Sequence, residues 1–230
     1  MFTVASNRSE AGKDHPPYAT LPSGLGNPED RTITKSNKSA HTPHLAPIVG
    51  FSASLTPTPL GLMLIARTEQ GICALALGKD HEALLTGLNP KTRERVVEHW
   101  AATSSADDEQ EQALAQFIAA SAQQNPAALL TLPLDLTGTD FQKRVWMALR
   151  QIPAGQTCSY RALALAIGNP RAVRAVARAC ATNPVALLIP CHRVIGSSGQ
   201  LTGYRWGLSL KQTLLAIECP HKSDPGALIL

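Results

Sequence analysis

Three short apolar runs, separated by turn sequences, set the strongest limit on what this 230-residue chain can fold into. They are IVGFSAS (48–54), LGLMLIAR (60–67) and GICALAL (71–77), with Thr-Pro-Thr-Pro and Glu-Gln-Gly between them. Runs of this length bounded by proline and glycine are typical of strands joined by turns. Two stretches with helical spacing of apolar residues, 80–88 and 107–122, follow. The pattern predicts an α/β N-terminal domain with a small sheet.

The second half of the chain has mainly helical patterns. LTLPLDLTG (130–138) is predicted as a last strand and a connector, and Thr139 or its neighbour can cap a helix through FQKRVWMALRQI. The residues expected on the buried face of that helix are Phe141, Val145, Met147, Ala148 and Ile152. Ser159 begins SYRALALAIG, and RAVRAVARACA follows a Gly-Asn-Pro turn. These two short helices have the outline of a helix-turn-helix in a mainly α C-terminal domain.

Composition suggests where the domains begin and end. Residues 1–46 are rich in Pro, Gly, Ser, Asn and Thr and hold few large apolar side chains, which is typical of disordered sequence. We therefore expect a disordered leader at 1–46, an N-terminal domain at 47–135, a helical domain at 136–219 and a tail at 220–230.

Hydropathy and cysteine usage bear on the compartment. No apolar run approaches the roughly 20 residues that span a bilayer, and the N-terminus lacks the pattern of a secretory signal. The five cysteines are scattered, odd in number and without CxxC spacing. Reduced thiols fit this pattern best, so we expect a cytoplasmic protein with no metal site and no membrane contact.

Charge is distributed unevenly along the chain. Residues 138–218 hold ten basic and two acidic side chains and carry +8, whereas the rest carries −4 of the overall +4. A polyanion such as nucleic acid is a suitable partner for the basic segment, because Arg and Lys neutralise phosphates. A solvated helical surface is the alternative explanation.

An arginine stripe marks the second of the two short helices. Arg171, Arg174 and Arg178 are three and four residues apart, so they share one face of a helix. Ala175 on that helix is small enough to allow close approach to another surface. The helix therefore suits a DNA groove. The alternative is that the arginines only solubilise a helix that packs through Val173 and Val176.

The sequence LLIPCHRVIG places Cys191 beside His192 at the end of an apolar run. A cysteine in such a position is more often part of the core than reactive. Here His192 can supply a base, Arg193 adds positive potential, and Glu218 provides a carboxylate late in the basic segment. A buried carboxylate must be paired, so Glu218 is expected to face His or Arg, and a Glu-His-Cys chain would favour the thiolate. An exposed Glu218 at the end of the last helix is the alternative.

The chain from 132 to 218 resembles the O6-alkylguanine-DNA alkyltransferases. IPCHRVIG is similar to the active-site signature of that family, and FQKRVW, SYRALA, GNPRAVRAV, NPVALLIPCHRV and GYRWGLSLKQTLLAIE resemble its other blocks in order. The resemblance is closest to the C-terminal half of the bacterial adaptive-response members. It extends more weakly back to about residue 51, where it implies a ribonuclease-H-like domain.

This resemblance implies a methylated-DNA-protein-cysteine methyltransferase, which repairs DNA by moving an alkyl group irreversibly from O6-alkylguanine in a duplex to its own cysteine. Cys191 would be the acceptor, and His192 its base through an ordered water. Glu218 would orient His192, and Asn183 would organise the active-site turn. Tyr160 would donate a proton toward the departing guanine.

The resemblance also implies how DNA is bound. Arg174 would enter the duplex and fill the space left by a flipped nucleotide, with Arg171, Arg178 and Ala175 on the same surface. The expected lining of the pocket for the flipped base is Val194, Tyr204, Arg205 and Trp206. The implied partner is duplex DNA carrying O6-alkylguanine, with O4-alkylthymine as a second candidate lesion, and the protein is expected to act as a monomer without a cofactor.

Two other classes of function remain as alternatives. A cysteine hydrolase would also use Cys, His and Asn, but its Cys and His are usually far apart in sequence, unlike Cys191 and His192. A non-catalytic alkylated-DNA-binding protein or helix-turn-helix regulator would explain the arginine stripe but would not need a reactive thiol.

Overall fold

The computed structural model describes residues 50–102 and 109–219. The predicted leader at 1–46 and the predicted tail at 220–230 lie outside the described residues. In chain order the elements are β1 Phe51–Thr58, β2 Gly61–Thr68, β3 Gly71–Gly78, α1 His81–Thr86, α2 Pro90–Ala102, α3 Glu109–Gln124, η1 Pro126–Thr131, α4 Asp140–Arg150, β4 Cys158–Ser159, α5 Tyr160–Ala166, α6 Val173–Ala181, η2 Cys191–Arg193, β5 Val194–Ile195 and α7 Leu208–Glu218. None of the helices in the described part is long and apolar enough to cross a membrane.

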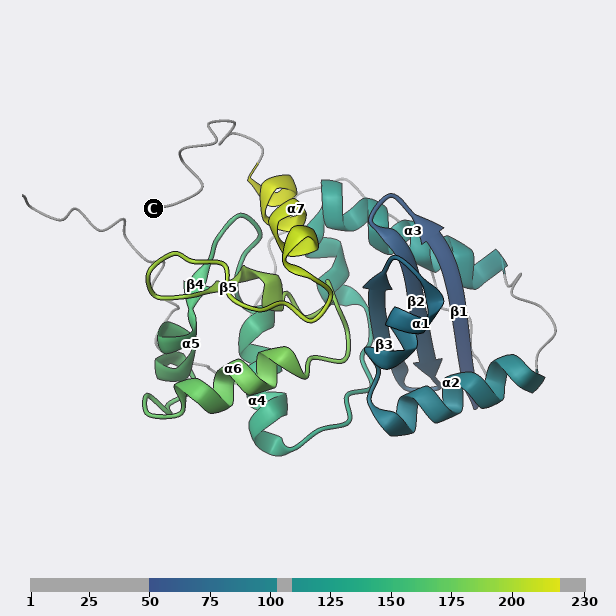
Figure 1. Cartoon of the computed structure of the whole chain (residues 1–230), viewed down its shortest axis with the longest axis horizontal. Coiled ribbons are helices and arrows are strands. Elements are labelled where there is room, and N and C mark those ends of the chain that lie inside the picture. Colours follow the sequence, from purple (N-terminus) through teal and green to yellow (C-terminus); the bar gives the residue numbers. More distant parts are fainter. Residues whose placement is uncertain (1–49, 103–108, 220–230) are drawn as a thin grey trace, which may run out of the picture.

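The N-terminal half is an antiparallel sheet in the order β1-β2-β3, with helices on both faces (Figure 1). Successive side chains of a strand point to opposite faces. Met63, Ile65 and Leu75 face a core shared with α3 and the C-terminal half. Leu64 and Ala76 face a second core closed by α1 and α2. One face of the sheet is therefore committed to holding the helical half in place.

The first strand differs from the predicted run 48–54. β1 reaches Thr58 and includes Pro57, which the sequence pattern had assigned to a turn. β1 is an edge strand of the sheet, where proline is tolerated because it need not donate a ladder hydrogen bond. The turn is limited to the two residues that precede Gly61.

Two other predictions for the N-terminal half were incomplete or wrong. Helix α2 was not expected, because its sequence has no apolar stripe. The structure agrees with that pattern, since Val96 is the only buried side chain among the described residues of the helix. The strand predicted at 130–138 does not form. Helix η1 covers its beginning, and Leu134 makes only an isolated parallel bridge to Ile72.

Helix α4 begins as predicted but buries a different side chain. Thr139 caps it in a capping box with Gln142, which satisfies N–H groups that lack partners within the helix. Met147, expected on the buried face, is 42% exposed, whereas Trp146 is 1% exposed and donates its Nε1–H to the carbonyl of Ala179 at 2.9 Å. The apolar face of α4 is therefore rotated toward α6.

Helices α5 and α6 follow one another across a short turn, as predicted. Ser159 caps α5 through the N–H of Ala162 at 3.0 Å. The prediction that Arg171 belongs to the next helix is wrong, because the N–H of Ala172 closes a turn onto the carbonyl of Asn169 at 2.9 Å and α6 begins at Val173. Arg171 lies in the turn before the helix.

Backbone hydrogen bonds join the sheet directly to the segment that leads to Cys191. The N–H of Leu75 in β3 donates to the carbonyl of Pro184 at 3.0 Å, and the N–H of Ala186 donates to the carbonyl of Leu75 at 2.9 Å. Leu75 and Val185 thus form a parallel bridge. The sheet edge therefore positions the chain at Val185, six residues before the cysteine.

Candidate active site

Two three-residue turns place Cys191 at the start of η2. The first is centred on Leu187, whose φ of +65° is the only positive value for a non-glycine residue in the described part, and the N–H of Leu188 closes it at 2.6 Å. The second is centred on Pro190, and the N–H of Cys191 closes it at 2.8 Å. A γ-turn with positive φ is strained. The burial of Leu187, 4% exposed, holds it in place.

Asn183 lies against the thiol. Its side-chain N–H₂ donates to Sγ of Cys191 at 3.2 Å and to the carbonyl of Ile189 at 2.8 Å. Its Oδ1 accepts from the N–H of Val185 at 3.0 Å. Asn183 and Cys191 are 0% and 4% exposed, so the amide joins the sheet-bound segment to the sulfur inside the core.

His192 and Glu218 form a buried pair beside the cysteine. Nε2 of His192 and Oε1 of Glu218 are 2.9 Å apart, and the side chains are 2% and 4% exposed. An ionised carboxylate only accepts hydrogen bonds, so Nε2 carries the proton of the neutral imidazole and Nδ1 is the acceptor. Nδ1 has no hydrogen-bond partner within residues 50–102 and 109–219.

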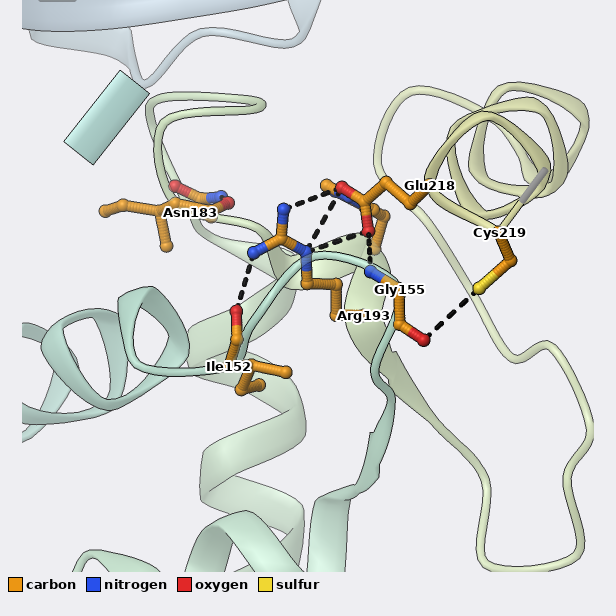
Figure 2. Close-up of polar contacts among 8 residues, drawn as sticks. Ile152, Gly155, Asn183, Arg193, Glu218 and Cys219 are labelled. Carbon is orange, nitrogen blue, oxygen red and sulfur yellow. Dashed lines mark hydrogen bonds and ion pairs between the residues drawn. The ribbon is translucent and has the colours of Figure 1, made fainter. Parts of the chain in front are cut away.

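Glu218 also binds Arg193, as Figure 2 shows. Nε of Arg193 lies 3.2 and 3.0 Å from the two carboxylate oxygens of Glu218, and its Nη2 lies 2.6 Å from Oε1. The remaining guanidinium nitrogen donates to the carbonyl of Ile152 at 2.6 Å. Oε2 of Glu218 accepts from the N–H of Gly155 at 3.3 Å. The segment after α4, helix η2 and the end of α7 therefore meet around the Arg193–Glu218 pair, and the alternative of an exposed Glu218 is wrong.

These contacts fix the charge of the pair. Burial alone would raise the pKa of Glu218, but hydrogen bonds from His192 and Arg193 outweigh it and lower the pKa to about 2. Burial lowers the pKa of His192 below its usual 6.5, against the opposing effect of Glu218. The site combines a charged carboxylate with a neutral imidazole near pH 7.

Burial also governs the ionisation of the Cys191 thiol. Burial raises the pKa of Cys191 to about 11, although the hydrogen bond from Asn183 and the charge of Lys211 oppose the rise. The raised pKa favours the thiol over the predicted thiolate at neutral pH. Neighbouring donors and charges do not compensate for the loss of solvation of the sulfur anion.

A buried lysine, whose role the sequence analysis missed, supports the strand next to the site. Lys211 of α7 is 0% exposed, and its Nζ donates to the carbonyls of Val194 at 2.6 Å and Thr202 at 3.2 Å. The available signal was its spacing of three and four residues from Leu214 and Leu215, which are also buried. Lys211 ties β5 to the loop that follows it.

The loop before α7 places aromatic rings over the site. The ring of Tyr204 meets that of His192 edge-on at 6.4 Å between centroids and that of Trp206 at 5.3 Å. Arg205 donates to the carbonyl of Asn183 at 3.2 Å. Across the loop, the Tyr160 hydroxyl accepts from Thr202 at 3.4 Å, and burial raises the pKa of Tyr160. The structure thus brings the predicted pocket residues together around His192 and Asn183.

The arginine stripe lies on the outer face of α6. Arg174, Ala175 and Arg178 are exposed, while Val176 is buried. Arg171 is also exposed, in the preceding turn. The helix therefore packs through its valine and presents its arginines to solvent, as both sequence interpretations require.

Comparison with known proteins identifies the class. Residues 52–136 match the family model described as the ribonuclease-like domain of 6-O-methylguanine DNA methyltransferase, and residues 140–219 match the model of its DNA binding domain. The chain belongs to the 6-O-methylguanine DNA methyltransferase family.

Individual relatives agree with this assignment. The chain is 46% identical over 169 residues to "Bifunctional transcriptional activator/DNA repair enzyme Ada" of Escherichia coli, a match that covers 74% of this chain and 46% of the relative. It is 40% identical over 161 residues to "Methylated-DNA--protein-cysteine methyltransferase" of Methanosarcina barkeri, with 70% and 92% covered. The chain spans about half the length of the first curated relatives it matches.

Solved structures share the fold. A crystal structure of Mycobacterium tuberculosis O6-methylguanine methyltransferase aligns with a TM-score of 0.54 at 34% identity, covering 76% of this chain and 96% of that chain. The M. tuberculosis OGT in complex with DNA aligns with a TM-score of 0.52 at 31% identity, covering 75% and 94%. These matches confirm the predicted order of a small N-terminal sheet with helices and a helical C-terminal half.

Proposed function

We propose that this chain repairs alkylated DNA by moving a methyl or larger alkyl group from O6 of guanine to Cys191. The observation that carries the proposal is a buried thiol beside a neutral imidazole whose other nitrogen binds Glu218, in a chain of this family. Relatives named methylated-DNA-protein-cysteine methyltransferase support it, as does the relative named a DNA repair enzyme.

The chemistry is a displacement at saturated carbon. The sulfur of Cys191 forms a bond to the alkyl carbon, and the bond from that carbon to guanine O6 breaks with its electron pair going to the base. The thiol proton passes through an ordered water to Nδ1 of His192, and Tyr160 donates a proton to the departing guanine. The imidazolium and phenolate left behind exchange one proton through solvent. The thioether formed has a poor leaving group, so each molecule acts once.

Ionisation of the thiol is tied to substrate binding in this scheme. The pKa of Cys191 is about 11 without DNA, so the thiolate exists only briefly, as the proton moves toward His192. A thiol that stays protonated at rest is also protected from oxidation and stray alkylation, because the thiolate is the nucleophilic form.

DNA binding is assigned to the helix-turn-helix of α5 and α6. Arg174, Ala175 and Arg178 are exposed on α6, and Arg171 extends the basic surface from the turn. Duplex DNA is the natural partner for such a surface. We take the protein to act as a monomer in the cytoplasm. The free cysteines at 73, 158, 180, 191 and 219 accord with a reducing compartment.

Cys191 is too deeply buried to meet a base that stays in the stack, so the lesion must be flipped out. Val194, Tyr204, Arg205 and Trp206 are proposed to line the base pocket. The N–H of Val194 already donates to the main-chain carbonyl of Cys191, and the carbonyl of Val194 already accepts from Nζ of Lys211. The carbonyl retains one lone pair for the base.

Mass spectrometry tests the assignment. After incubation with duplex DNA that contains O6-methylguanine, the peptide bearing Cys191 should gain one methyl group while the DNA becomes repaired. Cys191→Ser, nearly equal in size, should fold and leave the DNA unrepaired. An unmodified wild-type peptide with unrepaired DNA would overturn the assignment and favour a non-catalytic DNA-binding role.

A second experiment tests Arg174. Arg174→Ala should slow transfer from duplex DNA about tenfold or more, while reaction with the free base O6-methylguanine stays within about twofold, since only the duplex must be opened. Arg178→Ala is the matched control, because it removes one phosphate contact and weakens binding without a special effect on flipping. Equal losses on both substrates would remove the flipping role.

A further inference from the structure

The side chain of Arg193 is a buried part of the site. It follows the predicted base directly, yet its side chain is only 7% exposed and turns toward the end of α7. Its Nε and Nη2 donate to Glu218, and its Nη1 donates to the carbonyl of Ile152, two residues after the end of α4. This two-sided fork needs the planar guanidinium of arginine, which lysine cannot copy.

Oε1 of Glu218 is shared between two donors. It lies 2.9 Å from Nε2 of His192 and 2.6 Å from Nη2 of Arg193. A carboxylate bound to His192 alone would attract a second proton onto the imidazole, because an adjacent negative charge favours the imidazolium. The positive charge of Arg193 reduces that attraction while the hydrogen bond that orients the ring remains.

The other charged and titratable groups around His192 do not replace this effect. Lys211 of α7 adds a further positive charge, but its ammonium binds the carbonyls of Val194 and Thr202 rather than Glu218. The ring of Tyr204 meets His192 edge-on, and Cys191 carries a protonated thiol. Among residues 50–102 and 109–219, Arg193 is therefore the cation that directly contacts the carboxylate of the pair.

We propose that Arg193 is a positioning residue that keeps His192 neutral, with its free Nδ1 ready to accept the proton of Cys191, by sharing the charge of Glu218. The inference rests on the proposed transfer to Cys191. Loss of the Arg193 charge leaves Glu218 to act on His192 alone, so the imidazole becomes protonated at higher pH and ceases to be a base.

The test is the pH dependence of single-turnover transfer from an O6-methylguanine duplex, compared among wild type, Arg193→Met and Arg193→Lys. Arg193→Met should move the acid limb of the rate profile upward by about one pH unit. Arg193→Lys keeps the charge but loses the fork, so it should keep the limb near its wild-type position with a lower plateau. Arg67→Met, which breaks a buried pair distant in the chain, is the matched control and should leave the limb unmoved.

The possible results separate the two proposals. If wild type transfers no methyl group at any pH, the proposed function is wrong. If wild type is active and the transfer rate of Arg193→Met is lower by the same factor at every pH, Arg193 is merely structural and the inference is wrong. If Arg193→Met does not fold, Arg193→Gln and a ¹⁵N NMR titration of His192 in wild type decide. A neutral ring protonated on Nε2 at pH 7 and an upward limb in Arg193→Gln support the inference, and an imidazolium at pH 7 overturns it.

Discussion

The two halves of the described molecule each bury one arginine–glutamate pair, and the two pairs differ in their third member. In the N-terminal half Arg67 of β2 binds Glu111 of α3, with side chains 4% and 2% exposed, and Ser52 donates its hydroxyl to Glu111 at 2.9 Å. In the C-terminal half Arg193 binds Glu218, and the third member is the imidazole of His192.

The comparison shows that a buried ion pair gains a chemical role from what shares its carboxylate. A serine hydroxyl does not titrate, so the Arg67–Glu111 pair can only fix α3 against the sheet. An imidazole changes its charge near neutral pH. The Arg193–Glu218 pair holds the proton on Nε2 of His192 and thereby leaves Nδ1 as the base. Replacing both partners of a buried ion pair by apolar side chains changes stability little, whereas removing one partner is costly. The two pairs therefore differ mainly in their chemical role.

The largest effect is expected from breaking the structural pair. Arg67→Met leaves Glu111 buried without its cation and should lower the free energy of unfolding by about 3–5 kcal/mol, measured by urea denaturation. Methyl transfer well below the melting temperature should stay within about twofold of wild type. The double variant Arg67→Met/Glu111→Leu should regain most of the stability. If Arg67→Met slowed methyl transfer as much as Arg193→Met does, the two pairs would not differ in their role.

The next largest effect is the acid sensitivity of the second pair. The folded-state pKa of Glu218 is about 2, below its usual 4.5, so its contribution to stability is complete above about pH 4.5 and is lost as pH falls toward 2. The loss should amount to about 3 kcal/mol, at about 1.4 kcal/mol per pH unit. Denaturation of wild type and Glu218→Gln between pH 2 and 6 measures it, and parallel curves would contradict the prediction.

Glu218→Gln should also slow the reaction. An amide in place of the carboxylate no longer fixes the proton on Nε2 of His192, so the single-turnover rate at pH 7 should fall about a hundredfold. Glu111→Gln is the matched control and should change the rate less than about twofold. Similar losses in both variants would show that neither carboxylate acts through the imidazole.

The smallest effect is expected from the third member of the structural pair. Ser52→Ala removes the hydroxyl that donates to Glu111 and should cost about 1 kcal/mol of stability with no change in rate or in its pH profile. Thermal unfolding and a single-turnover assay measure the two quantities. A rate change would mean that the pair in the sheet communicates with the site.

The predictions that succeeded rest on local chemistry. Thr139 with Gln142 three residues later is a complete capping signal within one turn of chain. The expectation that Glu218 must be paired follows from the cost of burying a charge, and the structure supplies both candidates, His192 and Arg193. The roles of the individual site residues remain predictions that the experiments above test.

The predictions that failed depend on contacts distant in sequence. Met147 and Trp146 are adjacent, and which one is buried depends on the position of α6, whose carbonyl at Ala179 receives the indole N–H. Burial of Lys211 depends on the carbonyls of Val194 and Thr202. Spacing along one helix does not contain this information.

The main-chain bridge between β3 and Val185 has a consequence for how the protein melts. Two family models match residues 52–136 and 140–219 separately. The second region nevertheless pairs with the edge of the first region's sheet, and both regions contribute side chains to one core. The two regions are thus not independent cooperative units. Calorimetry of the intact chain should record a single heat-absorption peak, with no separate transition for either region.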